Sequence, residues 1–239
     1  MKNLVAMITG GAKGIGRACA ETFLESGHSV SLISRTASEL KQTEKELLAK
    51  YPGKVFSFCG DISSAPTVKD WFKKTIETLG YPTTLVNNAG IFVNKSVVDQ
   101  NLEDWEKVIR VNLTGAFLCA QELFRMALSH TGPKSIINMS SLAGIRGTEK
   151  FPGLSSYVAS KFALVGLTES LAVEGRKFGI RVNCIAPGAV GTEMLKKALP
   201  ELKAEATPKD IAKLVYFLSA PEQSSVLTGS TLEVFSNAT

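Results

Sequence analysis

The sequence predicts a single-domain, doubly wound α/β fold, with a sheet of about seven mostly parallel strands and helices on both faces. Three observations predict it. Short apolar runs alternate with longer segments of helical periodicity, most of the short runs are apolar throughout, and no Ser-, Pro- or Gly-rich linker interrupts the alternation. We therefore expect residues 1–239 to form one domain that binds its ligands at the carboxyl ends of the strands.

The predicted strands are too short for helices and are bounded by turn residues. They are Leu4–Ile8, Ser29–Ile33, Lys54–Phe58, Thr83–Val86, Ser135–Met139, Ile180–Ile185 and Thr231–Phe235. Between them, apolar residues recur every three or four positions, so each intervening helix buries one face. The clearest such sets are Ile15, Cys19, Phe23; Leu40, Leu47, Leu48; and Val68, Trp71, Phe72, Ile76, Leu79. A long helix is predicted over Ser155 to Phe178, and a later one begins at Thr207, followed by proline and then an acid at Asp210.

Composition excludes several classes of protein. An apolar content of 44% is too high for a disordered chain. The net charge of +5 is spread thinly, with no run of five basic residues, so we expect no nucleic-acid partner. The four cysteines lie 40, 60 and 65 residues apart, which predicts reduced thiols and no metal site. No apolar run approaches the roughly 20 residues that span a bilayer, and no targeting segment is recognised, so we expect a cytoplasmic protein without a membrane anchor.

A glycine-rich turn follows the first predicted strand. Residues 9–16 read Thr-Gly-Gly-Ala-Lys-Gly-Ile-Gly, and helical periodicity begins at once. Gly10 permits a tight turn, Gly14 lets the backbone approach a phosphate, and Gly16 lets the helix pack closely, with its free N–H groups facing an anion. The turn therefore predicts a site for a nucleotide pyrophosphate that includes Ile15, although a plain strand-to-helix loop is the alternative.

The end of the second strand indicates which dinucleotide binds. An acid there would bind the ribose hydroxyl of NAD, but the sequence has Ser34 and Arg35 instead. The Arg35 guanidinium suits a 2′-phosphate, and Lys13 is close enough in the turn to reach the same charge, which favours NADP(H). Ordinary surface cations are the alternative for both. Asp61, after the third strand, is expected to accept from the adenine amino group, or else to be a helix N-terminal acid.

Tyr157 and Lys161 lie four residues apart on one face of the long helix. The pattern alone is weak, but Ser140 and Ser141 end the fifth strand at the same sheet edge. We expect Ser141 to hold a substrate oxygen beside the Tyr157 hydroxyl, and Ser140 to bond to backbone. A tyrosine has an ordinary pKa near 10, so acid–base work at neutral pH requires the charge of Lys161 and of an oxidised nicotinamide to lower it.

These motifs together resemble the short-chain dehydrogenase/reductase family over essentially the whole chain, and in particular its 3-oxoacyl-acyl-carrier-protein reductase-like members. The matching positions, in order, are Thr9 to Gly16, Asn87-Asn88-Ala89-Gly90, Asn112, Ser141, Tyr157, Lys161 and Pro187-Gly188. The resemblance implies a Rossmann fold, with Tyr157 as acid/base, Lys161 on the nicotinamide ribose and Ser141 orienting the carbonyl. It also implies a homo-oligomer, a dimer or a tetramer, and a proton relay through Asn112, which the residues alone suggest to be a helix-interior polar group.

The resemblance extends the cofactor site to residues that no local pattern identifies. They are Ile62, Asn88, Ala89, Gly90, Pro187, Gly188, Val190 and Thr192, with Asn88 stabilising the central strand and Thr192 contacting the carboxamide. The implied activity is the reversible NADPH-dependent reduction of a ketone, with a 3-oxoacyl thioester as the favoured substrate. A sugar, a steroid-like molecule or a small ketone is an alternative substrate, and a non-catalytic NADP(H)-sensing regulator is the alternative of a different class. The loop between Ser141 and Tyr157 is longer than usual, which lengthens the mouth of the substrate site.

Overall fold

Seven strands form one fully parallel sheet in the order β3-β2-β1-β4-β5-β6-β7. The computed structural model describes residues 4–235, and residues 1–3 and 236–239 of the predicted domain lie outside the described part. The strands are β1 (Val5–Thr9), β2 (Ser29–Ser34), β3 (Val55–Cys59), β4 (Thr84–Asn87), β5 (Lys134–Met139), β6 (Ile180–Pro187) and β7 (Thr231–Val234). All seven predicted strands are confirmed to within a residue or two at each end.

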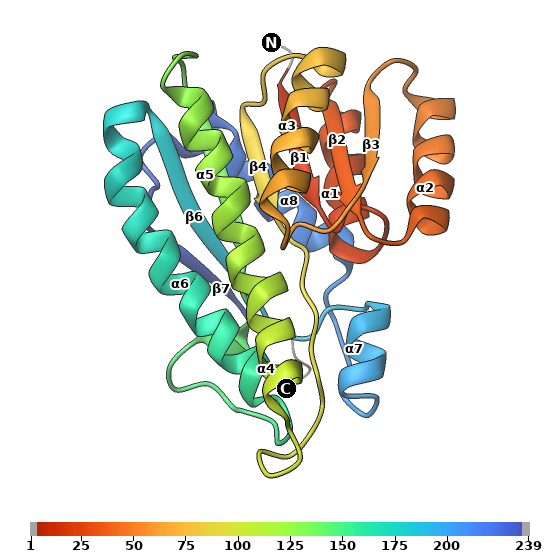
Figure 1. Ribbon diagram of the computed structural model, residues 1–239, viewed down its shortest axis with the longest axis vertical. Coiled ribbons are helices and arrows are strands. Elements are labelled where there is room, and N and C mark those ends of the chain that lie inside the picture. The colour runs from red at the N-terminus through yellow and green to blue at the C-terminus, as the bar shows by residue number, and fades with distance from the viewer. Residues whose placement is uncertain (1–3, 236–239) are drawn as a thin grey trace.

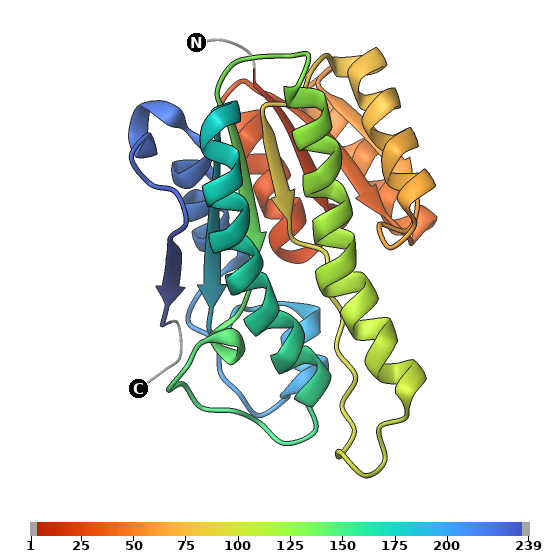
Figure 2. The same ribbon diagram turned by 60° about the vertical axis from the view of Figure 1, so that its left-hand side comes forward.

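Helices cover both faces of this sheet, with α3, α5 and α6 on one face and α1, α2 and α8 on the other (Figure 1, Figure 2). Their bounds are α1 (Gly14–Glu25), α2 (Ala37–Lys50), α3 (Ala65–Leu79), α4 (Leu102–Ile109), α5 (Gly115–Ala127), α6 (Ser155–Gly175), α7 (Glu193–Ala198), α8 (Pro208–Ser219) and α9 (Pro221–Ser224). Short 3-10 turns occupy Leu142–Gly144 and Arg176–Phe178, and a π-helical turn, Arg110–Thr114, joins α4 to α5. The predicted long helix therefore ends at Gly175, and its last three residues tighten into a 3-10 turn.

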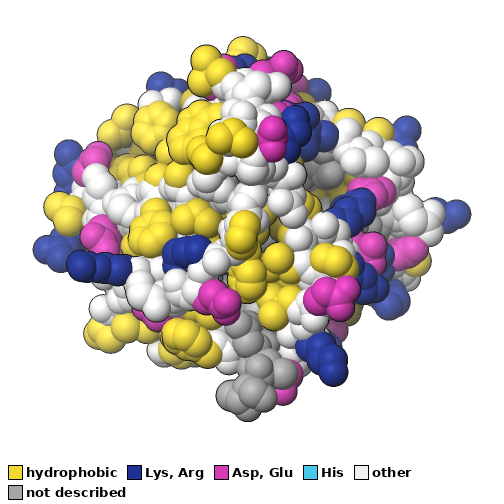
Figure 3. Space-filling model, turned by 90° about the horizontal axis from the view of Figure 1, so that it is seen from below, with side chains coloured by type: hydrophobic (Ala, Val, Ile, Leu, Met, Phe, Trp, Pro, Cys, Tyr) yellow, Lys and Arg dark blue, Asp and Glu magenta, His cyan; other side chains and the backbone are white. Residues whose placement is uncertain are grey.

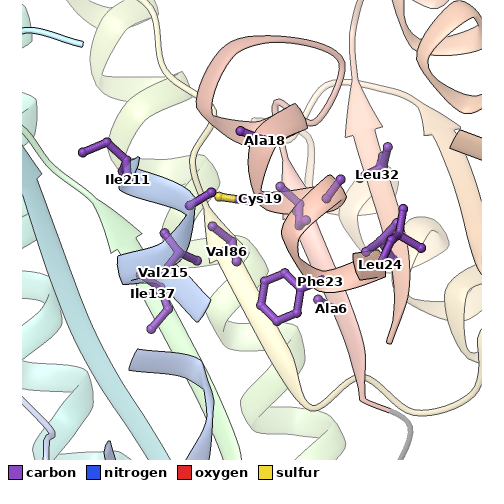
Figure 4. Packing of buried hydrophobic residues seen from close by; sticks show 14 of the residues in the cluster. Ala6, Ala18, Cys19, Phe23, Leu24, Leu32, Val86, Ile137, Ile211 and Val215 are labelled. Atoms are coloured by element: carbon purple, nitrogen blue, oxygen red, sulfur yellow. The ribbon is translucent and has the colours of Figure 1, made fainter. Parts of the chain in front are cut away.

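On the face covered by α1, α2 and α8, the core between helices and sheet centres on the contact of α1 with α8 (Figure 4). Cys19 and Phe23 of α1 pack with Ile211 and Val215 of α8, and all four are fully buried. Burial of a large apolar side chain contributes about 1.5–3 kcal/mol. The start of α8 is fixed as predicted, because the Thr207 hydroxyl accepts from the backbone of the third helical residue, whose carboxylate in turn accepts from the Thr207 N–H.

The strand order reverses between β1 and β4, so the chain leaves the sheet in opposite directions on either side of this point. In a parallel sheet such a reversal opens a crevice at the carboxyl ends of the strands. Those ends point down in Figure 2, where the loops after β4 and β5 and the short helix α7 extend beyond the sheet. The fold therefore directs three connecting segments to the edge at which the sequence predicts the site.

Two predicted absences can be compared with the described residues. Within residues 4–235, no helix is both long enough and apolar enough to cross a membrane. No group of three or more His, Cys, Asp or Glu side chains in that part could hold a metal ion. All four cysteines are free; Cys59 is exposed, and the other three are buried in the core.

Candidate functional site

A cleft of about 770 Å³ follows the carboxyl ends of the strands. Figure 3 shows this end of the molecule, where hydrophobic side chains gather among scattered acids and bases. The cleft is lined by every predicted site residue except Gly16 and Asn112, both of which lie behind its wall. The predicted residues that line it are Gly10, Lys13, Gly14, Ile15, Ser34, Arg35, Asp61, Ile62, Asn88, Ala89, Gly90, Ser141, Tyr157, Lys161, Pro187, Gly188, Val190 and Thr192.

The glycine turn has the backbone that a phosphate cradle requires. Gly10 and Gly14 have φ angles of +67° and +56°, which side chains rarely allow. A Cβ on Gly16 would lie 2.3 Å from the Gly10 carbonyl oxygen, so only glycine lets α1 approach its own turn. The Lys13 side chain makes no capping bond at the start of α1, and the first-turn N–H groups are therefore left for an anion in the cleft.

Charged side chains gather where the adenosine half of a dinucleotide would lie. Lys13 Nζ is 2.7 Å from Glu39 Oε1, and Arg35 Nη1 is 3.8 Å from Asp61 Oδ2. Asp61 also accepts from the Ser63 N–H at 2.9 Å, so its carboxylate shapes the turn after β3 as well as facing the cleft. Each predicted cation therefore stands beside an acid. Glu39 lines the cleft but is not predicted from the sequence, because it looks like an ordinary first-turn acid of α2.

Asn88 ties the ends of the two central strands together. Its Nδ2 donates to the Thr9 carbonyl at 2.9 Å, and its backbone N–H donates to Thr9 Oγ1 at 3.0 Å. The Ala89 N–H donates to the same hydroxyl at 2.9 Å. These bonds fix the loop after β4 against the end of β1, in the position that the family resemblance implies for Asn88. Thr192 caps α7 by accepting from the Leu195 N–H at 3.3 Å, which holds its methyl group beside Gly14.

Tyr157 and Ser141 meet at the middle of the cleft. Tyr157 lies in the first turn of α6 near Ser141, whose Oγ accepts from the Ala143 N–H at 3.1 Å. Burial raises the pKa of Tyr157 in the protein alone, and the Ser141 hydroxyl opposes that rise. The lowering expected from the sequence includes the charge of an oxidised nicotinamide and stays a prediction.

Lys161 is buried one helical turn beyond Tyr157, with only 4% of its surface exposed. Its Nζ donates to the Met139 carbonyl at 2.7 Å and lies 5.5 Å from the centre of the Tyr157 ring. Burial lowers the pKa of Lys161 to about 8. Ser140 Oγ donates to the Lys161 carbonyl at 2.8 Å, which is the backbone-bonding role expected of Ser140.

Asn112 sits in the π-helical turn between α4 and α5 and is fully enclosed. Its Oδ1 accepts from the Ile91 N–H at 2.8 Å, and its Nδ2 donates to the Ile91 carbonyl at 2.9 Å and to Ser160 Oγ at 2.9 Å. Ser160 in turn donates to the Tyr157 carbonyl at 2.7 Å. Gly90 lies beside both Asn112 and Lys161, since a Cβ there would meet Lys161 Nζ at 3.5 Å and Asn112 Oδ1 at 3.6 Å. The amide therefore links the first turns of α6 to the loop after β4.

The outer half of the cleft is lined by side chains that the sequence pattern did not identify. They come from the loops after β4 and β5 and from the segment around α7, and they are Phe92, Glu149, Phe151, Leu154, Glu193, Met194, Leu195, Leu199 and Leu202. These residues carry no motif, and only the fold brings their three segments together. Two hydroxyls and a buried cation at the middle of the cleft, with a mostly apolar outer half, form a site that can polarise and protonate the oxygen of an organic substrate.

Comparisons with known proteins agree with this arrangement. A family model described as short chain dehydrogenase matches residues 4–203. An uncharacterized oxidoreductase of Thermotoga maritima is 36% identical over 248 aligned positions, which cover 98% of this chain and 95% of the relative. A 3-oxoacyl-acyl-carrier-protein reductase of Chlamydia muridarum is 34% identical, covering 97% and 96%. The crystal structure of levodione reductase superposes with a TM-score of 0.86 at 30% identity, covering 97% of this chain and 95% of that one.

Proposed function

The chain belongs to the short-chain dehydrogenase/reductase family, and we propose that it reduces a ketone to a secondary alcohol, reversibly, with NADPH. One observation carries the proposal. Ser141, Tyr157 and Lys161 line the same cleft as the glycine turn after β1, so that a proton donor, a second hydroxyl and a buried cation stand at one end of a nucleotide-shaped groove.

The residues at the other end of the cleft fit a dinucleotide phosphate. The unsubstituted backbone of the turn and the open N-terminus of α1 suit a pyrophosphate, and a Cβ on Gly16 would close that cradle. Lys13 and Arg35 supply the positive charge that a 2′-phosphate requires, and the end of β2 carries Ser34 in place of an acid. These features support NADP(H) over NAD(H).

When bound, NADPH supplies the hydride for the carbonyl carbon. Ser141 orients the carbonyl oxygen by donating a hydrogen bond to it, and Tyr157 delivers its hydroxyl proton to that oxygen. Lys161 stabilises the tyrosinate that remains, because its ammonium lies 5.5 Å from the Tyr157 ring. In the reverse direction the tyrosinate accepts the proton of the alcohol.

The buried groups behind Lys161 support a path for the replacement proton. Asn112 lies across Gly90 from the Lys161 ammonium. Both polar atoms of its amide are bound to the Ile91 backbone, so the group is held in one orientation. We propose that Asn112 and Lys161 together hold a water through which Tyr157 is reprotonated, which is the relay that the family resemblance implies.

The names of relatives favour a 3-oxoacyl thioester as the substrate, since a 3-oxoacyl-acyl-carrier-protein reductase is among them. Reduction of acetoacetyl thioesters without reduction of free ketones would select that substrate, and the opposite result would select a small ketone. The cytoplasmic location and the homo-oligomer stay predictions. Sedimentation of the purified protein would measure the oligomeric state.

Replacement of Tyr157 by phenylalanine tests the proposed reaction. NADPH oxidation is followed with a panel of ketones, and NADPH binding is followed by its fluorescence. Tyr157→Phe should abolish turnover and leave NADPH binding intact, whereas the matched variant Tyr81→Phe, on the exposed turn after α3, should keep both. Undiminished turnover by Tyr157→Phe would contradict the mechanism. Tight NADPH binding by the wild-type protein with no turnover on any carbonyl would favour the non-catalytic sensor.

The cofactor is tested separately at Arg35. Arg35→Asp removes the guanidinium and adds an acid where NAD-binding proteins carry one, so the NADPH/NADH ratio of kcat/KM should fall at least about tenfold. An unchanged ratio would show that Arg35 does not contact the 2′-phosphate.

A further inference from the structure

The outer half of the cleft is closed by three segments that are far apart in the sequence. The Lys95 N–H donates to the Gly153 carbonyl at 3.0 Å, which joins the loop after β4 to the long loop after β5. Asn94 Nδ2 lies 3.5 Å from the Ala198 carbonyl, at the end of α7. A Cβ on Gly153 would overlap Asn94, so these loops are in tight contact. The loop after β4 is therefore held between the lengthened loop after β5 and the end of α7, and the lengthened loop is a wall of the substrate site.

The lining of this outer half is apolar. Phe92, Phe151 and Leu154 come from the two loops, and Leu199 and Leu202 come from the segment after α7. Contact between these side chains and an apolar ligand is favourable, because it removes apolar surface from water. Burial of an ionic group among them costs free energy, because they cannot replace its hydration. A ligand that reaches from Tyr157 toward the mouth of the cleft therefore contacts mostly carbon.

The charges at this end of the cleft are all negative. Glu149 and Glu193 line it. Glu193 lies 3.3 Å from Lys196, which offsets its charge, whereas Glu149 makes no ion pair with any residue in the described range 4–235. Beyond Lys161 at the reaction centre, the only basic side chains that line the cleft are Lys13 and Arg35, at the opposite end, among the residues described.

The rim carries basic residues, but they do not line the cleft. They are Lys95, Arg146, Lys150, Lys196, Lys197 and Lys203. Lys95 Nζ is bound to Asp104 at 2.6 Å. Lys150 Nζ is bound to the Ile145 and Thr148 carbonyls at 2.7 and 2.8 Å, within its own loop. The ammonium groups of Lys150, next to Glu149 in the sequence, and of Lys95, on the facing loop, are therefore bound to oxygens other than those of Glu149.

We propose that the outer half of the cleft selects an uncharged, apolar ketone and that Glu149 disfavours anionic ones. The inference rests on the proposed ketone reduction and specifies its substrate class. It accommodates a 3-oxoacyl thioester on a neutral carrier arm, but it disfavours a free oxo acid or a thioester whose anionic group enters the outer cleft. The apolar lining disfavours an anion by removing it from water, and Glu149 adds a repulsion that its own exposure to solvent reduces.

One pair of substrates tests this with NADPH oxidation as the readout. 5-Oxohexanoate and its ethyl ester share a carbonyl and a chain but differ by one charge, which lies within a few bonds of the carbonyl. The wild-type protein should reduce the ester with a kcat/KM at least about tenfold above that of the anion. An anion reduced as well as its ester would overturn the proposal.

Glu149→Lys should narrow the ratio for 5-oxohexanoate and its ester by about fivefold, mainly through a better KM for the anion. Glu201→Lys is the matched control, because Glu201 is exposed in the segment after α7 and does not line the cleft, and it should leave the ratio as it is. An unmoved ratio in Glu149→Lys, or an equal change in Glu201→Lys, would remove Glu149 from the proposal.

NADPH fluorescence separates the two levels of inference. If NADPH binds and only anionic ketones are reduced, the substrate class is wrong and the proposed reaction stands. If NADPH binds and no ketone of either charge is reduced, the reaction itself fails, and the substrate class fails with it.

Discussion

The ammonium of Lys13 lies 2.7 Å from the carboxylate of Glu39, and both side chains line the cleft. Arg35 and Asp61 repeat this relationship at 3.8 Å. The two cations that would bind a 2′-phosphate are thus each matched by an acid, and the formal charge of the four is zero. A phosphate entering here must compete with Glu39 for Lys13, so the proposed preference for NADPH would depend on the acid as well as on the two bases.

Replacing Glu39 by glutamine should therefore strengthen binding of the phosphorylated nucleotide. Both side chains of the pair are largely exposed, and such pairs are worth only about 0–1 kcal/mol, so we expect an affinity for 2′,5′-ADP about threefold higher. Binding of 5′-AMP, which lacks the 2′-phosphate, should stay the same. Isothermal titration calorimetry measures both without turnover.

The matched control for this prediction is Glu46→Gln. Glu46 pairs with Arg17 at 2.6 Å between the same two helices, but neither residue lines the cleft. Equal effects of Glu39→Gln and Glu46→Gln on 2′,5′-ADP would mean that only the net charge of the protein changed.

Asn112→Leu should destabilise the protein as well as slow it. The substitution leaves the partly buried N–H and carbonyl of Ile91 without their protein partner, which costs about 1–3 kcal/mol of unfolding free energy. Urea unfolding measures the loss. Ser160→Ala removes only one of the three bonds of Asn112 and should cost about 1 kcal/mol. If Asn112→Leu proves as stable as the wild-type protein, the amide does not brace the loop after β4.

The lowered pKa of Lys161 predicts how stability varies with pH. In the folded protein the pKa is about 8, whereas the ordinary lysine value is 10.5. The unfolded chain therefore binds more protons between these values, and the penalty for burying the charge, complete below pH 8, fades as pH rises toward 10.5. Lys161→Met escapes the penalty, so its stability relative to wild type should be greatest below pH 8 and should fall by about 3 kcal/mol across this window.

Urea titrations at a series of pH values provide the measurement. Lys161→Ala serves as the control, because it differs from Lys161→Met in packing and shares the loss of charge, so both should show the same pH dependence on different baselines. A stability difference that stays flat from neutral to alkaline pH would show that burial does not lower the pKa of this lysine.

Replacement of two helical glycines by alanine should have different effects, a loss of NADPH affinity at Gly16 and a gain of stability at Gly166. A Cβ on Gly16 would lie 2.3 Å from the Gly10 carbonyl and 2.6 Å from Asn88 Nδ2, so α1 must shift and NADPH affinity should fall at least about tenfold. A Cβ on Gly166, in α6, meets nothing within 4 Å. Gly166→Ala should raise the free energy of unfolding by about 0.5–1 kcal/mol and leave NADPH binding unchanged. Equal NADPH affinities for the two variants would argue against a tight cradle at the turn.

The sheet could be predicted from the sequence because its strands are buried on both sides. The central strands are buried at every position and each contains an apolar run, and their limits are marked by Gly, Asn and Ser, so local composition was sufficient. The positions of Ser141 and Tyr157 followed for the same reason, since one ends a recognisable strand and the other begins a recognisable helix. Order in the sheet is not a local property, but the alternation of elements restricts it strongly.

The remainder of the site depends on contacts that sequence spacing does not show. Glu39 faces Lys13 only after α1 and α2 pack together, and the bond of Lys161 to Met139 needs α6 laid across β5. Burial raises the pKa of Tyr157 in the protein alone, which sequence spacing does not show, whereas the expected lowering depends on a bound oxidised nicotinamide as well as on Lys161. The wall formed by Asn94 and Gly153 joins loops without periodicity, where no pattern could predict it.

The π-helical turn at Arg110–Thr114 also has an evolutionary consequence. A π turn accommodates one residue more than an α-helix would over the same length. Loss of a single codon between α4 and α5 would give an unbroken, more regular helix, and would rotate everything beyond it by about 100° relative to the residues before it. The Asn112 amide could then no longer reach Ile91. The extra residue thus marks a one-step mutational route by which a descendant could retain the fold and lose the orientation of its buried amide.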